Sequence, residues 1–187
     1  MDQQTIVVVV ASVIVAVLII IGLVYWRRRR SAMLRERFGP EYDRVVRDKG
    51  DRRKAEGVLE WRAKKREQLR IVPLSRAVRS DFANRWTKVQ SRFVDDPKGS
   101  VADADELVTE LMHARGYPMA DFEQQAEMIS VDHPVVVQNY RAAHDIAMRH
   151  DRGQASTEDL RTAMVHYRSL FEELLEDEVP ERREARG

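Results

Sequence analysis

The sequence predicts an all-α protein with an N-terminal transmembrane helix, a basic helical stalk and a compact C-terminal bundle of about five helices. Residues 6–26 contain no charged side chain. Beyond them, apolar residues recur at spacings of three and four, which is the period of an α-helix. No stretch alternates as a strand does, and the chain has only eight glycines and six prolines among 187 residues.

The uncharged segment 6–26 predicts a membrane-spanning helix. Fifteen of its 21 residues are Val, Ile or Leu, which favour insertion into a bilayer by about 5–9 kcal/mol in total. A helix of this length rises about 30 Å, which matches the hydrocarbon core. A cleaved signal peptide would instead need a basic region ahead of an apolar core of about 7–15 residues. We therefore predict a permanent anchor.

Basic residues flank this segment on its C-terminal side only, which predicts its orientation. By the positive-inside rule, residues 1–5 lie outside the cytoplasmic membrane and the C-terminal domain lies in the cytoplasm. The protein would then be a single-pass membrane protein with its N-terminus outside and its C-terminus inside. The cytoplasmic end carries two aromatic interface anchors and four arginines that can contact anionic lipid: Tyr25, Trp26, Arg27, Arg28, Arg29 and Arg30.

Residues 27–72 form the predicted stalk. Between residues 27 and 70 the net charge is +9, whereas it is −7 over residues 71–187. Gly39-Pro40 and Gly50 predict breaks between helices, and the apolar residues are too sparse for a wide core-facing stripe. We therefore expect a solvated spacer, or a segment that adheres to anionic headgroups at about 1 kcal/mol per basic residue. Interleaved acids and the lack of a recognised module make nucleic-acid binding unlikely.

We predict a cytoplasmic bundle over residues 73–176. Residues 177–187 are predicted to form a charged, disordered tail. Several end signals delimit the helices of the bundle. Gly116 suits the end of a helix, Ser156 and Asp159 resemble a capping box, and Asp132-His133-Pro134 resembles a helix start. The five helices follow from five apolar stripes: 78–93, 101–111, 119–129, 136–147 and 160–174.

The first of these stripes contains three aromatic residues, Phe82, Trp86 and Phe93. Their spacing of three or four residues places them on one helical face. Such a face belongs in the core of a bundle. The alternative is a groove that receives a helix of a partner protein.

The sequence contains little that indicates catalysis. It has no cysteine, which excludes disulfides, thiolate metal sites and a cysteine nucleophile. No two histidines have the i,i+4 spacing of a helical metal site. Tyr140 and His144 share a face that His166 could meet, and this polar cluster is the basis of an alternative prediction, a ligand-binding or catalytic bundle. We expect no enzyme, no cofactor and no metal.

Several motifs stand out beyond the apolar segment. In the stalk they are residues 34–44 and 50–53, and in the bundle they are Arg85-Trp86, 92–95, 115–118, 121–123 and 166–168. Together they resemble motifs of small single-span membrane proteins from high-GC, actinobacterial-type bacteria. The resemblance implies a bacterial inner-membrane protein and carries over no activity or site residue.

These features together predict a membrane-anchored, non-enzymatic interaction or adaptor module. The expected partners are the lipid bilayer, with its anionic headgroups as a candidate contact, and a protein that meets the acidic bundle at the membrane surface.

Overall fold

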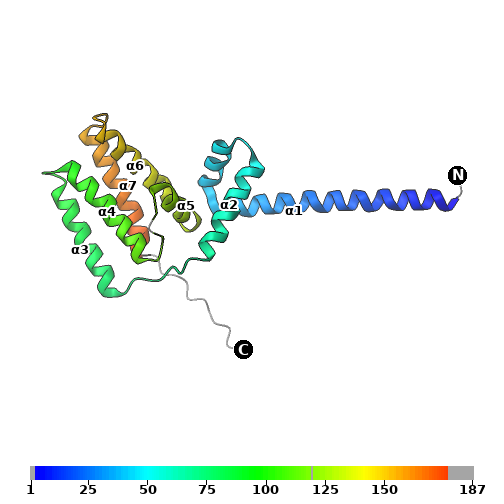
Figure 1. Ribbon diagram of the computed structural model, residues 1–187, viewed down its shortest axis with the longest axis horizontal. Helices are drawn as coiled ribbons and strands as arrows, with labels where there is room; N and C mark the ends of the chain where they lie inside the picture. Colours follow the sequence, from blue (N-terminus) through cyan, green and yellow to red (C-terminus); the bar gives the residue numbers. More distant parts are fainter. Residues whose placement is uncertain (1–2, 119, 177–187) are drawn as a thin grey trace, which may run out of the picture. The chain divides into compact units, whose positions relative to one another are not determined.

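The computed structural model describes the backbone of residues 3–118 and 120–176, and side chains from residue 14 onward. Within these residues all regular structure is helical, so the all-α prediction is confirmed. The predicted N-terminus (1–5) and tail (177–187) lie partly or wholly outside the described residues. The seven helices of Figure 1 are α1 (Gln3–Lys49), α2 (Arg52–Glu67), α3 (Arg76–Arg92), α4 (Pro97–Ala114), α5 (Phe122–Asp132), α6 (Val136–Asp151) and α7 (Thr157–Glu176).

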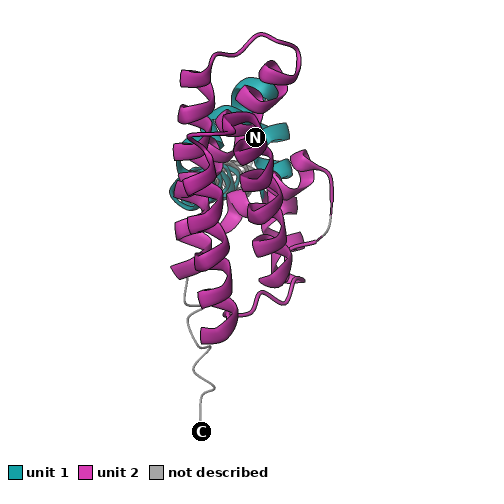
Figure 2. Ribbon diagram, turned by 90° about the vertical axis from the view of Figure 1, so that its left-hand side faces the viewer, with its two compact units in different colours: residues 1–59 teal, residues 60–187 magenta. Residues whose placement is uncertain are grey.

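The chain forms two compact units, residues 1–59 and residues 60–187, shown in teal and magenta in Figure 2. The division falls inside α2, thirteen residues before the predicted boundary at 72/73. Arg62 and Arg66, which we assigned to the stalk, therefore belong to the second unit and form ion pairs there. Arg62 Nη2 lies 2.7 Å from Glu127 Oε1, and Arg66 pairs with Asp132.

Two glycines shape the first unit. Gly39 interrupts α1 with φ 46° and ψ −127°, a conformation that glycine adopts readily and other residues do not. Pro40 follows and begins the next helical segment, as expected of a residue with a fixed φ and no backbone N–H. Gly50, at φ 62°, separates α1 from α2. Both predicted breaks are confirmed.

The prediction that this region is a solvated spacer is wrong for several of its side chains. Phe38, Tyr42, Val45, Ala55 and Leu59 are each at most 2% exposed. No single helical stretch here carries a wide apolar stripe, which is why the stretches looked solvated when each was considered separately. The turns at the two glycines reverse the chain, so residues on both sides of each turn are removed from solvent.

The part of α1 that precedes this region exposes its apolar side chains. Every large apolar residue from Ile14 to Trp26 is between 46% and 66% exposed. Within the described residues, no helix is both long enough and apolar enough to cross a membrane, so the predicted transmembrane helix is not supported by this finding. The predicted segment 6–26 includes residues 6–13, whose side chains lie outside the described part of the chain.

The second unit is a helical bundle in which α7 packs extensively against α4 and α6, α3 packs against α4, and α5 packs against α6 (Figure 1). The predicted apolar stripes supply its core. Trp86 of α3 stacks on Phe171 of α7, with ring centroids 4.6 Å apart and planes 17° apart. The predicted bundle of five helices, α3–α7, is confirmed.

Most of the predicted helix-end signals are also confirmed. Ser156 N donates to Asp159 Oδ2 (2.7 Å) while Asp159 N donates to Ser156 Oγ (3.2 Å), which is a reciprocal capping box. Gly116 ends α4 with φ 96°, and a Cβ there would lie 2.3 Å from the Arg70 carbonyl oxygen. Only glycine therefore fits at this position.

The predicted helix start at Asp132-His133-Pro134 is correct in place, since Val137 N donates to the His133 carbonyl oxygen (3.1 Å), but Asp132 does not cap the helix. Asp132 is the last residue of α5, and α6 begins at Val136 with no side-chain cap. The carboxylate of Asp132 instead accepts a hydrogen bond from Tyr117 Oη (2.7 Å) and pairs with Arg66. These partners lie 15 and 66 residues away, so local capping rules could not reveal them.

An arginine-lined pocket as the candidate functional site

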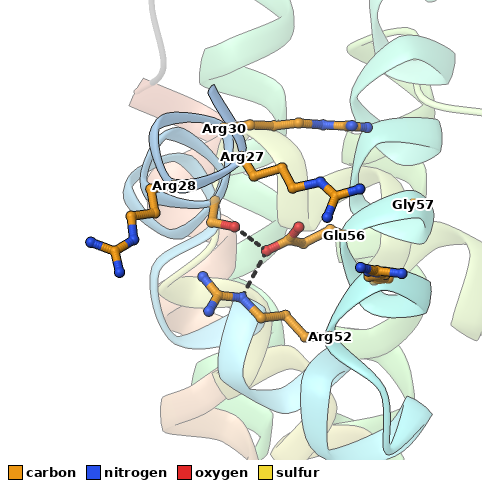
Figure 3. A pocket seen from close by; sticks show the side chains of 8 residues that line it. Arg27, Arg28, Arg30, Arg52, Glu56 and Gly57 are labelled. Carbon is orange, nitrogen blue, oxygen red and sulfur yellow. Dashed lines mark hydrogen bonds and ion pairs between the residues drawn. The ribbon is translucent and has the colours of Figure 1, made fainter. Parts of the chain in front are cut away.

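Side chains of helices α1 and α2 line an open pocket of about 420 Å³ within the first unit. Five arginines and one carboxylate line it, together with a serine and a glycine. The contributions are Arg27, Arg28, Arg30 and Ser31 from α1, and Arg52, Arg53, Glu56 and Gly57 from α2 (Figure 3).

Glu56 connects the two helices at this pocket. Its Oε1 atom accepts hydrogen bonds from Ser31 Oγ (2.5 Å), Tyr42 Oη (2.9 Å) and Arg52 Nε (3.0 Å). Burial opposes ionisation of the carboxyl group, but the three hydrogen bonds outweigh it and lower the pKa of Glu56. Burial and the neighbouring carboxylate raise the pKa of Tyr42. At neutral pH the carboxylate is therefore charged and the phenol is a donor.

The arginines of the pocket differ in their surroundings. Arg52 is paired with Glu56, and the guanidinium of Arg30 lies 5.4 Å from the centre of the Trp26 ring. Figure 3 shows the Arg27 and Arg30 side chains extending to the same side, toward the helix that carries Gly57, while Arg28 extends away from them. Among the described residues, Arg27 and Arg53 form no hydrogen bond or ion pair with another side chain.

Gly57 leaves part of the pocket wall without a side chain. It lies in the interior of α2, where glycine costs about 1 kcal/mol relative to alanine. A Cβ at this position would meet nothing within 4 Å, so close packing does not require the glycine. Because glycine has no side chain, the pocket stays open at this position beside the guanidinium groups.

The charge of this pocket suits it to bind an anion. Guanidinium groups form planar, two-pronged hydrogen bonds with carboxylates and phosphates and stay charged at every physiological pH. Glu56 is already engaged by Ser31, Tyr42 and Arg52, and within the described residues it forms no ion pair with Arg27 or Arg53. The chemistry that the residues offer is therefore recognition of negative charge.

Sequence reasoning identified this site in part. Of the four predicted lipid-contacting arginines, Arg27, Arg28 and Arg30 line the pocket and Arg29 does not. Arg52 and Arg53 were not identified from the sequence as site residues. Their position directly after the Gly50 turn was a signal that both could lie near α1. The predicted interface anchors Tyr25 and Trp26 are 66% and 58% exposed, and their contact with lipid stays a prediction.

The predicted polar cluster of the second unit is assembled only in part. Tyr140 and His144 both contact Phe122, whose ring centroid lies 4.8 Å from that of Tyr140 and 3.6 Å from that of His144. Tyr140 is buried, and its hydroxyl donates to Gln125 Oε1 (3.1 Å). Across the described residues, no hydrogen bond or ring contact joins His166 to either residue. A ligand-binding or catalytic role for the three stays an untested prediction.

A different set of polar residues lies around Tyr140. Burial and the Asp105 carboxylate raise the pKa of both Tyr140 and Tyr167, whose rings meet edge to face with centroids 6.2 Å apart. Sequence reasoning missed Asp105 and Tyr167 because each lies on a face shared with core residues. Over the described part of the chain, no three His, Asp or Glu side chains are grouped so that they could hold a metal ion.

The aromatic stripe of α3 belongs to the core. Phe82 and Trp86 are buried, and Phe93 is partly buried against the same core. A groove for a partner helix would require these rings to be accessible, and it stays an untested prediction.

Comparison with known proteins adds no assignment. No family model matches this chain, and neither a curated protein nor a solved structure is significantly similar to it.

Proposed function

We propose that this chain is a membrane-anchored, non-enzymatic interaction module of a bacterial inner membrane, with its N-terminus outside and its helical bundle in the cytoplasm. The observation that carries the proposal is the run of exposed apolar side chains from Ile14 to Trp26, which leads directly into four arginines. The alternative of a ligand-binding bundle has no comparable observation in its favour.

The exposed run covers every side of its helix. Five consecutive residues, 17–21, are each 48–62% exposed. Because successive residues of an α-helix are turned by about 100°, five of them point in all directions around the axis. A helix in a soluble protein keeps one apolar stripe for its core, whereas a helix that is apolar all round needs an apolar environment all round. A bilayer supplies that environment.

The charges on the two sides of the span support the orientation. The four arginines after residue 26 favour retention on the cytoplasmic side, whereas residues 1–5 contain no basic residue. The bundle would then work at the inner surface of the membrane. Residues 71–187 carry a net charge of −7, which favours a protein partner with a basic surface through long-range attraction.

Membrane extraction of the full chain tests the anchor. Expressed in bacteria, the chain is expected to stay in the membrane pellet after an alkaline carbonate wash. Arginines in place of Ile19 and Ile20 should release it, because two central arginines cost about 5–7 kcal/mol, comparable to the whole gain from insertion. Val165→Arg, at an exposed site of α7, is the matched control and should leave the chain in the pellet.

A wild-type chain that washes off with carbonate would contradict the anchor. Orientation is tested separately with alkaline phosphatase fused to the C-terminus, which is active only outside the cytoplasm and should therefore stay silent. The partner is tested by proximity labelling from the C-terminus. Proteins labelled by the wild-type chain and lost with the Ile19→Arg/Ile20→Arg variant are candidates for partners at the membrane.

A further inference from the structure

We infer that the arginine-lined pocket of the first unit binds a phosphate group. This goes beyond membrane anchoring and does not depend on it, because the pocket is built from residues after the apolar run. Phosphate chemistry could reach the pocket from two sources, the headgroup of an anionic lipid or a soluble phosphate compound.

Uncompensated positive charge is the first step of the argument. Arg27 and Arg53 have no side-chain partner among the described residues, and Arg53 is exposed at the pocket wall. Glu56 is engaged by Ser31, Tyr42 and Arg52 and serves as the link between helices. Bringing like charges together in one recess is unfavourable unless an anion or solvent ions balance them.

The geometry of the recess is the second step. Guanidinium groups reach it from two different helices, and the hydrogen bonds from Ser31 and Tyr42 to Glu56 hold those helices together. A ligand can therefore be contacted from both sides, which a single run of arginines on one helix does not offer. The volume of about 420 Å³ exceeds what a phosphate group needs, so there is room for the remainder of a headgroup or a small phosphorylated molecule.

The glycine in the wall is the third step. Glycine at position 57 makes α2 less stable than alanine would, although a Cβ there would point into open space. An unpacked glycine inside a helix is explained if something approaches the backbone there. A phosphate has a higher charge than a carboxylate and more oxygens for guanidinium forks, so it makes better use of several arginines at once.

Titration of the full chain in a neutral detergent tests the inference with two probes. One arm measures the heat of binding of inorganic phosphate. The other adds short-chain phosphatidic acid to the micelles, with phosphatidylcholine as the lipid control. Arg53→Gln and Arg27→Gln should each weaken binding by about tenfold, since hydrogen bonds between charged groups are the strong ones.

Two matched controls separate a built pocket from general attraction. Arg29→Gln removes an arginine from the same run that does not line the pocket, and should change affinity less than about twofold. Gly57→Leu removes no charge and improves helix propensity, but it fills the recess and should abolish binding. Gly57→Ala, which adds only a methyl group, should weaken binding less than Gly57→Leu does, and thermal unfolding of each variant checks that the fold is intact.

The outcomes distinguish the sources of the phosphate. Binding of inorganic phosphate with this pattern of variants supports a soluble ligand, and binding of phosphatidic acid alone with the same pattern supports a lipid headgroup. The inference is overturned if neither probe binds, if Arg29→Gln weakens binding as much as Arg27→Gln, or if Gly57→Leu binds as the wild type does.

Discussion

Tyr42 donates a hydrogen bond of 2.9 Å to Glu56, and with it joins the segment of α1 that follows Gly39 to helix α2. The tyrosine is 2% exposed and the carboxylate is half-buried, so this contact is shielded from water on one side. Ser31 and Arg52 donate to the same oxygen. One ionised carboxylate therefore links three parts of the first unit, which makes the unit sensitive to the protonation of Glu56.

Acid should loosen the first unit. The folded-state pKa of Glu56 is lowered below its ordinary value of 4.5, so its stabilising contribution is present above about pH 4.5 and is lost as the pH falls through the lower, folded value. Hydrogen–deuterium exchange over residues 40–59 should accelerate in wild type relative to Glu56→Gln as the pH is lowered through that window. The glutamine variant lacks the titrating group and serves as the reference at each pH. Equal exchange ratios throughout would show that Glu56 does not hold the unit together.

Gly39→Ala should destabilise the first unit by about 1–3 kcal/mol, because alanine at φ 46° and ψ −127° is strained. Exchange protection around residues 34–45 is the measurement. The control is Gly57→Ala, a helix-interior position with open space around the added methyl, which should instead stabilise α2 by about 0.5–1 kcal/mol. If Gly39→Ala were tolerated as well as Gly57→Ala, the break in α1 would not need a glycine.

Trp86→Ala should cost the second unit about 3–5 kcal/mol, because the ring is 5% exposed and stacks on Phe171. Denaturant unfolding of the full chain, followed by loss of helical circular dichroism, measures the change. Val94→Ala, at a side chain that is 85% exposed, is the control and should stay within about 0.5 kcal/mol of wild type. An unchanged stability of Trp86→Ala would favour the partner-groove hypothesis over the core.

Three tyrosines of the second unit should resist ionisation. Burial raises the pKa of Tyr117, Tyr140 and Tyr167 above the ordinary 10.0, and neighbouring carboxylates raise it further. A raised pKa means that the stabilising contribution is complete below about pH 10 and is lost as the pH rises toward the folded values. In an absorbance titration these residues should form tyrosinate only as the bundle unfolds.

The control for this titration is the chain in urea, where all tyrosines should ionise near pH 10. Tyr117→Phe should reduce the late absorbance step by about one quarter of its amplitude, because Tyr42 of the first unit, whose pKa is also raised, is a fourth late phenol. An early, fully reversible ionisation of all tyrosines in the folded chain would contradict their burial.

The helices and their ends could be predicted because their signals are local. The capping box at Ser156 and the break at Gly39 each depend on backbone geometry within four residues, and the stripes that contain Trp86 or Leu174 repeat along a single helix. Such patterns are present in any short window of the sequence. The uncharged segment 6–26 is a signal of the same local kind, and its membrane role stays a proposal.

The sequence by itself thus determined the all-helical fold, the breaks at the two glycines and the placement of most helix ends. Only the tertiary structure decided that Arg53 and Gly57 line one pocket with the arginines at the end of the apolar run. It also decided that the Asp132 carboxylate accepts a hydrogen bond from Tyr117 and does not cap α6. The physical reason is separation along the chain. A hydrogen bond from Ser31 to Glu56 spans 25 residues and exists only after two turns have reversed the backbone. Local periodicity records which face of a helix is apolar, but not which distant side chain will lie against it.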